Sequence, residues 1–326
     1  MKKGINVFSG CDGIGCLMLA LKTQGVVINK YYASEILSNP IKVAMKNHPE
    51  IIQMGDILRW REWDIDWASI DVLGFGFPCQ AFSLTGKKKG LKDIMARKVF
   101  FACIEIYYRV KDLNPNVQVI FENVKMTKEN RKAISEYIGF YPTFLNSSLV
   151  SAQNRPRNYW TSIPGVIPPP NDCGYKLTDI VPGAVAVGSH GRDTGIKKSD
   201  GSVKWAAKDT FNKKNKSYCL TRNNGYCKYV KDGVKLKFTA AECEQLQTLP
   251  IGYTDVEGIT QGERIEMIGN AWTVNMIRYL ITLLPEYPKW DKVNETYDLI
   301  REYSFHARKW TKKDYDHARE VLGKNN

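Results

Sequence analysis

Short apolar runs separated by polar or glycine-rich segments recur through the first half of the chain. They cover residues 5–8, 31–33, 51–54, 70–75, 117–120 and 143–150. Between several of them, apolar positions recur with helical spacing, as in residues 17–22, 43–48 and 99–110. Buried strands that alternate with helices are typical of a doubly wound, Rossmann-like α/β core. We therefore predict such a core over residues 1–163.

The pattern changes near residue 163. Pro164-Gly165 and three consecutive prolines at 168–170 break the alternation, and the chain that follows is rich in Gly, Lys, Asn and Ser. We predict a second, smaller domain over residues 164–260. A helix expected from residue 261 to 284 would return the chain to the first domain, so that residues 261–326 form a C-terminal segment with an extension. The role of the extension, residues 289–326, is left open.

A glycine-rich turn follows the first apolar run, at residues 9–15. Its spacing differs from the GxGxxG fingerprint, and it lacks the lysine of the phosphate-binding loop, so a phosphate-bearing cofactor is disfavoured. Glu35 and Asp56 end the next two runs, and an acidic side chain at such a position typically binds ribose hydroxyls. An ordinary tight turn would explain the glycines alone. The three strand ends together indicate an adenosine-containing ligand, and S-adenosylmethionine fits without phosphates.

A cysteine and a glutamate follow two further runs. Cys79 comes after residues 70–75, and Glu122 comes after residues 117–120. Taken singly, a free cysteine is more often a packed core residue, and a glutamate more often caps a helix or pairs with a cation. In one cleft, however, a thiol can attack C6 of a pyrimidine while a carboxyl group hydrogen-bonds a ring nitrogen. The pair therefore favours chemistry on a pyrimidine base.

The order of these motifs resembles that of the DNA (cytosine-5)-methyltransferase family over most of the chain. The matching segments are Phe8-Ser9-Gly10, Asp12-Gly13-Ile14, Glu35, Asp56-Ile57, Pro78-Cys79-Gln80, Glu122-Asn123-Val124, the QxRxR residues Gln153, Arg155 and Arg157, Leu246-Gln247 with Pro250, and Gly269-Asn270 with Val274. In detail the likeness is greatest to the vertebrate de novo branch, which shares the run Tyr-Ala-Ser-Glu that ends at Glu35. The resemblance implies a methyltransferase core joined to a smaller target-recognition domain.

The resemblance also implies an activity. The enzyme would transfer the methyl group of S-adenosylmethionine to C5 of cytosine in DNA and release S-adenosylhomocysteine. Cys79 would form a covalent bond to C6 and Glu122 would act as the acid. Arg157, and secondarily Arg155, would hold the pyrimidine O2. No residue is assigned to removal of the C5 proton. The implied cofactor-binding residues are Phe8, Ser9, Asp12, Gly13, Ile14, Glu35, Ile36, Asp56, Ile57, Gly76, Pro78, Asn270, Ala271 and Trp272.

Contacts to double-stranded DNA are expected in two places. The target atom is unreachable in a stacked duplex, so the cytosine must be flipped out. The loop after the nucleophile resembles the mobile loop that closes over DNA in this family, and its expected contacts are Ser83, Lys87, Lys88 and Lys89. A solvated basic loop is the alternative interpretation. Arg222 and Asn223 are candidates for reading bases, or else for contacting the backbone. The likeness suggests a CpG-containing site.

Composition agrees with a polyanionic partner. The 326 residues carry a formal net charge of +13, which favours binding to phosphates. The absence of an 18-residue apolar run and of a signal-like start indicates neither membrane insertion nor export. The eight cysteines form no CxxC pair, and there are only four histidines, so we expect neither a metal site nor a disulfide framework. A cytoplasmic location is the simplest expectation.

Two alternatives remain at this point. One is a tRNA-methylating branch of the same family, which keeps the Pro-Cys-Gln and Glu-Asn-Val motifs. The other is an inert DNA-binding relative, although such a protein would be expected to have lost some of Cys79, Glu122, Glu35 and Asp56. A restriction-modification system with a cognate restriction enzyme is also possible. The sequence does not indicate the oligomeric state, the target sequence or any preference for hemimethylated DNA.

Overall fold

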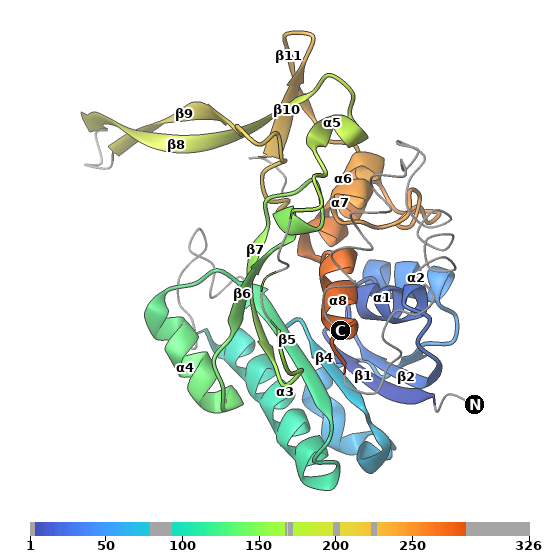
Figure 1. Ribbon diagram of the computed structural model, residues 1–326. Coiled ribbons are helices and arrows are strands. Elements are labelled where there is room, and N and C mark those ends of the chain that lie inside the picture. The colour runs from blue at the N-terminus through green and yellow to red at the C-terminus, as the bar shows by residue number, and fades with distance from the viewer. Residues whose placement is uncertain are drawn as a thin grey trace.

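The computed structural model describes residues 4–78, 93–166, 168, 172–197, 203–222 and 227–284, which form a large α/β unit and a smaller antiparallel sheet (Figure 1). The predicted C-terminal extension lies outside these ranges. Within the described part of the chain, no helix combines the length and the apolar character needed to cross a membrane.

The larger sheet has seven strands in the order β3-β2-β1-β4-β5-β7-β6. Strands β1 to β5 pair in parallel, whereas β7 is antiparallel to both β5 and β6. The strands are β1 (Ile5–Gly10), β2 (Ile28–Ser34), β3 (Ile52–Gln53), β4 (Val72–Phe75), β5 (Gln118–Val124), β6 (Thr143–Asn146) and β7 (Pro156–Thr161). The strand order reverses between β1 and β4, which is where ligands bind in doubly wound sheets. The predicted Rossmann-like core is confirmed.

Helices cover both faces of the large sheet. One core contains residues of α1, α2 and α8, and the other contains residues of α3, α4 and the 3-10 helix η1. These elements are α1 (Cys16–Thr23), α2 (Ser38–Asn47), α8 (Val274–Ile281), α3 (Ile94–Leu113), α4 (Lys128–Ile138) and η1 (Ile57–Glu62). Successive residues of β1 pack on opposite faces of the sheet: Val7 lies in the first core and Phe8 in the second. Burial on both faces explains why these strands read as continuous apolar runs.

Two paired strands that lie beyond β4, namely β5 and β7, differ from the prediction. β5 continues to Val124, so Glu122 lies inside the strand instead of after it. β7 was not predicted, because its segment begins with Pro156 and Arg157 and has no apolar run. The two strands pair with Val124 opposite Arg157. This pairing extends β5 as far as Val124 and brings Glu122 and Arg157 to the same edge of the sheet.

The smaller sheet has the order β11-β10-β8-β9, with all its pairs antiparallel. Its strands are β8 (Val185–Lys197), β9 (Val203–Phe211), β10 (Cys227–Lys231) and β11 (Val234–Lys237). The β8–β9 hairpin projects from the body of the molecule (Figure 1). At its base, Ala186, Cys227 and Tyr229 are buried in the same core as α1 and α8. The sheet is therefore anchored at one end and extends outward at the other.

The returning segment contains two helices instead of the one that was predicted. α7 (Gln261–Asn270) ends before Ala271, whose backbone is extended, and α8 begins at Val274. The carbonyl oxygen of Ala271 accepts hydrogen bonds from Arg155 Nη2 at 2.8 Å and from Gln247 Nε2 at 2.9 Å. In a continuous helix this carbonyl oxygen would accept a hydrogen bond from a backbone N–H of the next turn. Here it accepts from two side chains of other segments instead. Two shorter helices, α5 (Leu177–Ile180) and α6 (Ala240–Leu246), precede this segment.

Candidate active site

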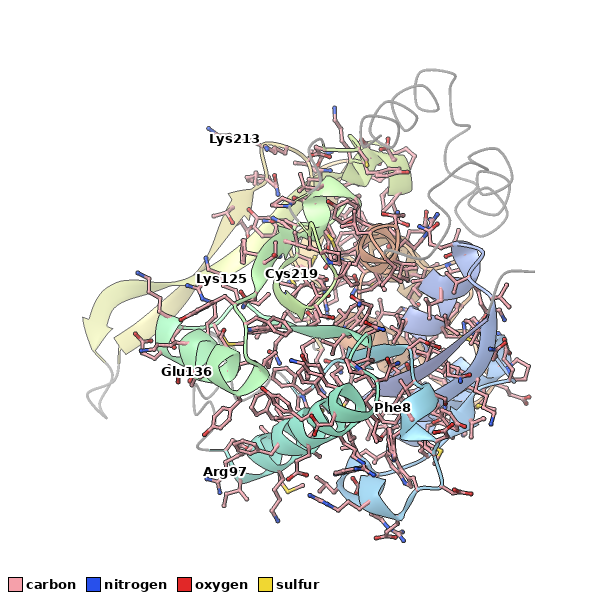
Figure 2. All side chains as sticks on the ribbon, turned by 60° about the horizontal axis from the view of Figure 1, so that its bottom comes forward. Phe8, Arg97, Lys125, Glu136, Lys213 and Cys219 are labelled. Carbon is pink, nitrogen blue, oxygen red and sulfur yellow. The ribbon has the colours of Figure 1, made fainter. Side chains whose placement is uncertain are left out.

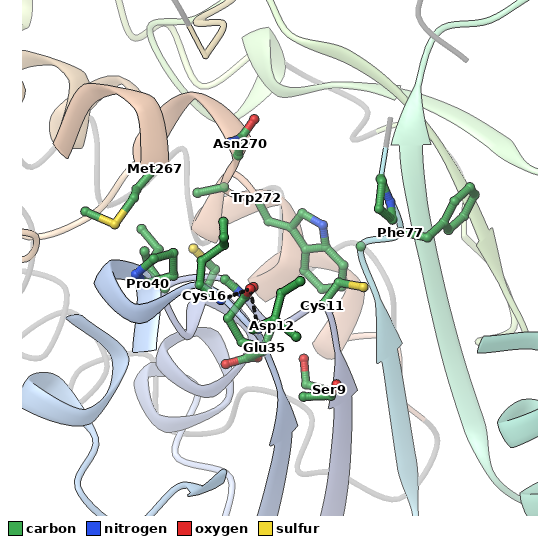
Figure 3. A pocket seen from close by; sticks show the side chains of 18 of the residues that line it. Ser9, Cys11, Asp12, Cys16, Glu35, Pro40, Phe77, Met267, Asn270 and Trp272 are labelled. Carbon is green, nitrogen blue, oxygen red and sulfur yellow. Dashed lines mark hydrogen bonds between the residues drawn. The ribbon is translucent and has the colours of Figure 1, made fainter. Parts of the chain in front are cut away.

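A cavity of about 520 Å³ lies at the carboxyl ends of β1, β2 and β4 and reaches β5 (Figure 3). It is lined on one side by the glycine-rich turn and on the other by α7 and the segment that follows it. Among the predicted site residues, those that line it are Ser9, Asp12, Gly13, Ile14, Glu35, Ile36, Asp56, Ile57, Gly76, Pro78, Glu122, Arg155, Arg157, Asn270, Ala271 and Trp272. Phe8 instead lies fully buried among Trp63, Trp67 and Phe75.

The glycine-rich turn holds a buried carboxyl group at the cavity. Cys11, Gly13 and Gly15 all have positive φ, at 56°, 63° and 79°, so the chain reverses tightly after β1. Asp12 Oδ1 accepts a hydrogen bond from the Tyr31 hydroxyl at 2.7 Å, while its Oδ2 meets no hydrogen-bonding group among the described residues. Burial raises the pKa of Asp12 to about 6, against the opposing effect of the Ser9 and Tyr31 hydroxyls. An unsatisfied buried oxygen indicates a place for a ligand donor.

Glu35 ties the glycine-rich turn to the end of β2. Its Oε2 accepts from the backbone N–H of Gly13 at 3.0 Å, and its Oε1 accepts from those of Ile36 at 2.7 Å and Leu37 at 3.0 Å (Figure 3). Asp56, which follows β3 and caps η1, accepts from the N–H of Leu58 at 3.0 Å and lines the same cavity. Both carboxylates are thus fixed by backbone donors and retain acceptor capacity for hydroxyl groups.

Trp272 forms a wall of the cavity between the turn that carries Asp12 and the helix end that carries Asn270 (Figure 3). Its indole passes close to two glycines at the end of β4. A Cβ at Gly76 would lie 3.1 Å from Trp272 Nε1, and one at Gly74 would lie 3.5 Å from Trp272 Cη2 and 2.5 Å from Leu17 Cδ2. The glycines that precede Cys79 therefore make room for this wall. The sequence predicted Trp272 at the cofactor site but not its packing against these glycines.

Glu122 and Arg157 form an ion pair where the cavity reaches β5. Glu122 Oε1 lies 2.9 Å from Arg157 Nε, and the two side chains are only 12% and 10% exposed. In the next position, Asn123 Nδ2 donates to the carbonyl oxygen of Phe77 at 3.0 Å. Asn123 therefore fixes the exit of the chain from β4, immediately before the predicted nucleophile. A satisfied pair of this kind is well oriented because neither group can move without losing its partner.

The other QxRxR residues hold the backbone together. Arg155 is buried and donates to the carbonyl oxygens of Leu220 at 2.9 Å, Gly269 at 3.0 Å and Ala271 at 2.8 Å. Gln153 is also buried, accepts from the N–H of Leu220 at 2.9 Å and donates to the carbonyl oxygen of Leu246 at 3.1 Å. Through these bonds the two side chains join three segments that are distant in sequence. Of the three motif residues, Arg157 is the one that pairs with Glu122.

The predicted DNA contacts are only partly described. Cys79, Ser83, Lys87, Lys88, Lys89 and Asn223 lie outside the described residues. Arg222 is described and is half exposed; its Nε lies 2.5 Å from Oε1 of Glu266 on α7. Glu266 itself lines the cavity. Sequence reasoning singled out neither Glu266 nor Asn123 for these contacts, since each has meaning only through a partner elsewhere in the chain.

No group of three or more His, Cys, Asp or Glu side chains arranged to hold a metal ion occurs in the described ranges.

The cavity has two chemically different ends. Asp12, Glu35 and Asp56 lie at an acidic and glycine-rich end, and Glu122 meets Arg157 at the other. The first end suits hydroxyl and amino groups of a ligand, and the second end suits a planar polar ring.

Comparison with known proteins agrees with this arrangement. Residues 3–163 match the family described as C-5 cytosine-specific DNA methylase. The type II methyltransferase M.NgoBV of Neisseria gonorrhoeae is 34% identical over 139 residues, a segment that spans 42% of this chain and 31% of that relative. The match thus covers about a third of the relative's length.

Solved structures extend the similarity to most of the chain. The Entamoeba histolytica methyltransferase EhMeth is 15% identical with a TM-score of 0.60, over 86% of this chain and 98% of that one. DNMT2 of Spodoptera frugiperda is 17% identical with a TM-score of 0.55, over 86% and 99%. At this identity the likeness supports the fold. Together with the motif order, the match over residues 3–163 shows that this part of the chain belongs to the C-5 cytosine-specific DNA methylase family.

Proposed function

We propose that the protein transfers the methyl group of S-adenosylmethionine to C5 of a cytosine in double-stranded DNA. The observation that carries this proposal is one continuous cavity, lined by Asp12 and Glu35 at one end and by Glu122 and Arg157 at the other. A donor and an acceptor of a methyl group must meet in one enclosed space for direct transfer. The family description supports cytosine as the base and DNA as the polymer.

The acidic end of the cavity fits S-adenosylmethionine. The volume of about 520 Å³ falls within the range typical of cofactor pockets. Oδ2 of Asp12, which has no partner among the described residues, could accept from the amino group of the methionine moiety. Glu35 and Asp56 lie where ribose hydroxyls would be held, and Ile36 and Trp272 offer apolar surface for the adenine. When bound, the cofactor supplies an electrophilic methyl group.

The chain's own residues would perform the remaining chemistry. The thiolate of Cys79, one residue beyond Pro78 at the cavity, would add to C6 of cytosine while Glu122 donates a proton to N3. C5 thereby becomes nucleophilic and accepts the methyl group. Loss of the C5 proton to an unassigned base, return of the N3 proton to Glu122 and departure of the Cys79 thiolate would restore the aromatic ring. Arg157 would hold the pyrimidine O2 and keep Glu122 in place.

The duplex would lie against the smaller sheet and the loop after Cys79. We propose residues 164–260 as the target-recognition domain, with Arg222 and Asn223 facing the bases or the backbone. Ser83 and the lysines at 87–89 would contact the phosphates around the flipped nucleotide. The net charge of +13 supports a polyanionic partner of this size. A CpG-containing site remains our prediction for the target.

The proposal is tested by offering labelled S-adenosylmethionine with either unmethylated duplex DNA or tRNA. We expect label in DNA with the wild type, and a loss of at least about 100-fold with Glu122→Gln, because general acid catalysis contributes this much. Label in tRNA alone would establish the RNA-methylating alternative. Tight binding to DNA with no label in either polymer would establish the inert relative.

A further inference from the structure

Cys219 lies beside the guanidinium groups of two arginines of the candidate active site. Its Sγ is 3.6 Å from Nη1 of Arg155 and 3.7 Å from both Nη1 and Nη2 of Arg157. The residue follows β9 in the chain and is partly exposed. Figure 2 places it among densely packed side chains. It belongs to the smaller domain by sequence but reaches the active site of the larger one.

The charges in this part of the site alternate. Glu122 pairs with Arg157, Arg157 contacts Cys219, and Cys219 contacts Arg155. Glu122, Arg155 and Arg157 are each buried. Two guanidinium groups that donate to one sulfur favour its anionic form, because each positive charge and each hydrogen bond stabilises a thiolate more than a thiol. A thiolate at Cys219 would therefore be stabilised by both arginines.

Among the described residues, two titratable neighbours of this group are uncharged. Burial raises the pKa of Tyr159 on β7 and of Cys227 on β10, which keeps both uncharged at neutral pH. Burial opposes ionisation of Cys219, and so does the carbonyl oxygen of Leu220, which lies 3.3 Å from Sγ and accepts a hydrogen bond from the neutral thiol. The charges of Arg157 and Arg155 and their hydrogen bonds to Sγ outweigh both effects, so the pKa of Cys219 is lower than that of an ordinary thiol.

We propose that Cys219 is a thiolate in the free protein and a positioning residue for Arg157, completing a buried chain of alternating charge with Glu122 and Arg155. It forms no bond to the substrate. By accepting hydrogen bonds from Nη1 and Nη2 of Arg157, it orients the guanidinium whose Nε faces Glu122. Its part in turnover rests on the proposed function, whereas its ionisation can be measured without any substrate.

The charge on Cys219 is tested by the pH dependence of its alkylation with iodoacetamide. A Cys79→Ala chain is used, and the mass of the peptide containing Cys219 is followed so that other thiols do not interfere. We expect a midpoint below the ordinary thiol value of about 8.5. Arg157→Gln should raise it by about one unit or more, while Arg278→Gln, which removes a partly buried arginine of α8, should leave it unchanged. A midpoint at or above about 8.5 in the Cys79→Ala chain, or one that Arg157→Gln does not move, would overturn the proposal.

The positioning role is tested by turnover. Cys219→Ser keeps the size but loses the charge, and we expect kcat/KM to fall about tenfold. Cys219→Asp keeps a negative charge and should recover most of that loss. As the pH falls through the alkylation midpoint, the wild type should approach the rate of Cys219→Ser, whose own rate should stay level there. A serine variant as active as the wild type, or an aspartate variant as poor as serine, would overturn the role. If the wild type methylates no cytosine, the proposed function fails while the alkylation result still stands.

Discussion

Glu122 on β5 and Arg157 on β7 are held 2.9 Å apart by the antiparallel pairing of their strands, and both are nearly buried. Removing one partner of such a pair leaves the other charge without compensation. We expect Arg157→Leu to lower the free energy of unfolding by about 3 kcal/mol. Glu122→Gln, which retains hydrogen bonding, should cost less. Urea denaturation of both variants measures the difference, and equal losses would show that the pair is not electrostatically coupled.

Cofactor affinity should depend on pH through Asp12. Its folded pKa is raised to about 6 from 3.8, so the carboxyl group is largely protonated at pH 5 and ionised at pH 7. An ionised Asp12 attracts a cationic amino group, so the Kd of S-adenosylhomocysteine should fall as the pH rises through about 6. Isothermal titration calorimetry from pH 5 to 7.5 measures this.

Asp12→Asn serves as the control for that titration. The amide cannot ionise, so we expect weaker binding, by about tenfold for one lost charged hydrogen bond, with a Kd that no longer changes near pH 6. The sign for stability is opposite. Because a raised carboxyl pKa means that the native state holds the proton more tightly, the contribution of Asp12 is fully present below about 3.8 and is lost as the pH rises through about 6. A Kd for the wild type that weakens from pH 5 to 7 would contradict the assignment.

Arg222 and Glu266 predict a test of base recognition. Their ion pair is 54% and 38% exposed, and an exposed pair contributes only about 0.2–1 kcal/mol. DNA should therefore displace Glu266 from Arg222 easily. Arg222→Ala should lose about 1–3 kcal/mol of base discrimination, and Glu266→Gln should tighten DNA binding by up to about fivefold. Binding to variant duplexes measures both effects. Unchanged site preference in Arg222→Ala would reject its role in reading the target.

Gly269 predicts a steric coupling between α7 and the segment before Arg222. A Cβ at this position would lie 2.5 Å from the carbonyl oxygen of Thr221 and 2.9 Å from the backbone nitrogen of Arg222. Gly269→Ala must displace that backbone, so we expect a loss of stability of about 1–3 kcal/mol and a loss of DNA discrimination. Gly262→Ala is the matched control in the same helix, because its nearest contact would be 4.0 Å away. It should be neutral or stabilising by up to about 1 kcal/mol. Similar melting curves for the two variants would refute the coupling.

The continuous apolar runs were sufficient to predict the parallel part of the fold. Residues 70–75 gave the position of β4, and the glycines after β1 gave the turn at Asp12, because local composition determines both features. The sequence did not predict β7, because Pro156 and Arg157 at its start are not typical of a strand. It did not predict the break at Ala271, because that break depends on hydrogen bonds from Arg155 and Gln247, which are far away in sequence.

The candidate site divides in the same way. Glu35 and Glu122 could be found because each follows or lies in a recognisable apolar run. Cys219 and Glu266 could not, since their significance depends on contacts with Arg157 and Arg222 that only the folded chain brings about. Both Arg155 and Arg157 belong to one sequence motif, and only the structure distinguishes their contacts. Arg155 donates to three carbonyl oxygens, whereas Arg157 faces the carboxylate of Glu122.

The central claim is tested most directly by exposing unmethylated DNA to the protein with S-adenosylmethionine and mapping protected cytosines at base resolution by conversion sequencing. Parallel reactions use the wild type and Cys79→Ala. We predict protected cytosines in one fixed sequence context with the wild type and none with the variant. Protection that persists in Cys79→Ala would contradict attack by this thiol, and no protection with an S-adenosylmethionine-binding wild type would contradict DNA cytosine methylation itself.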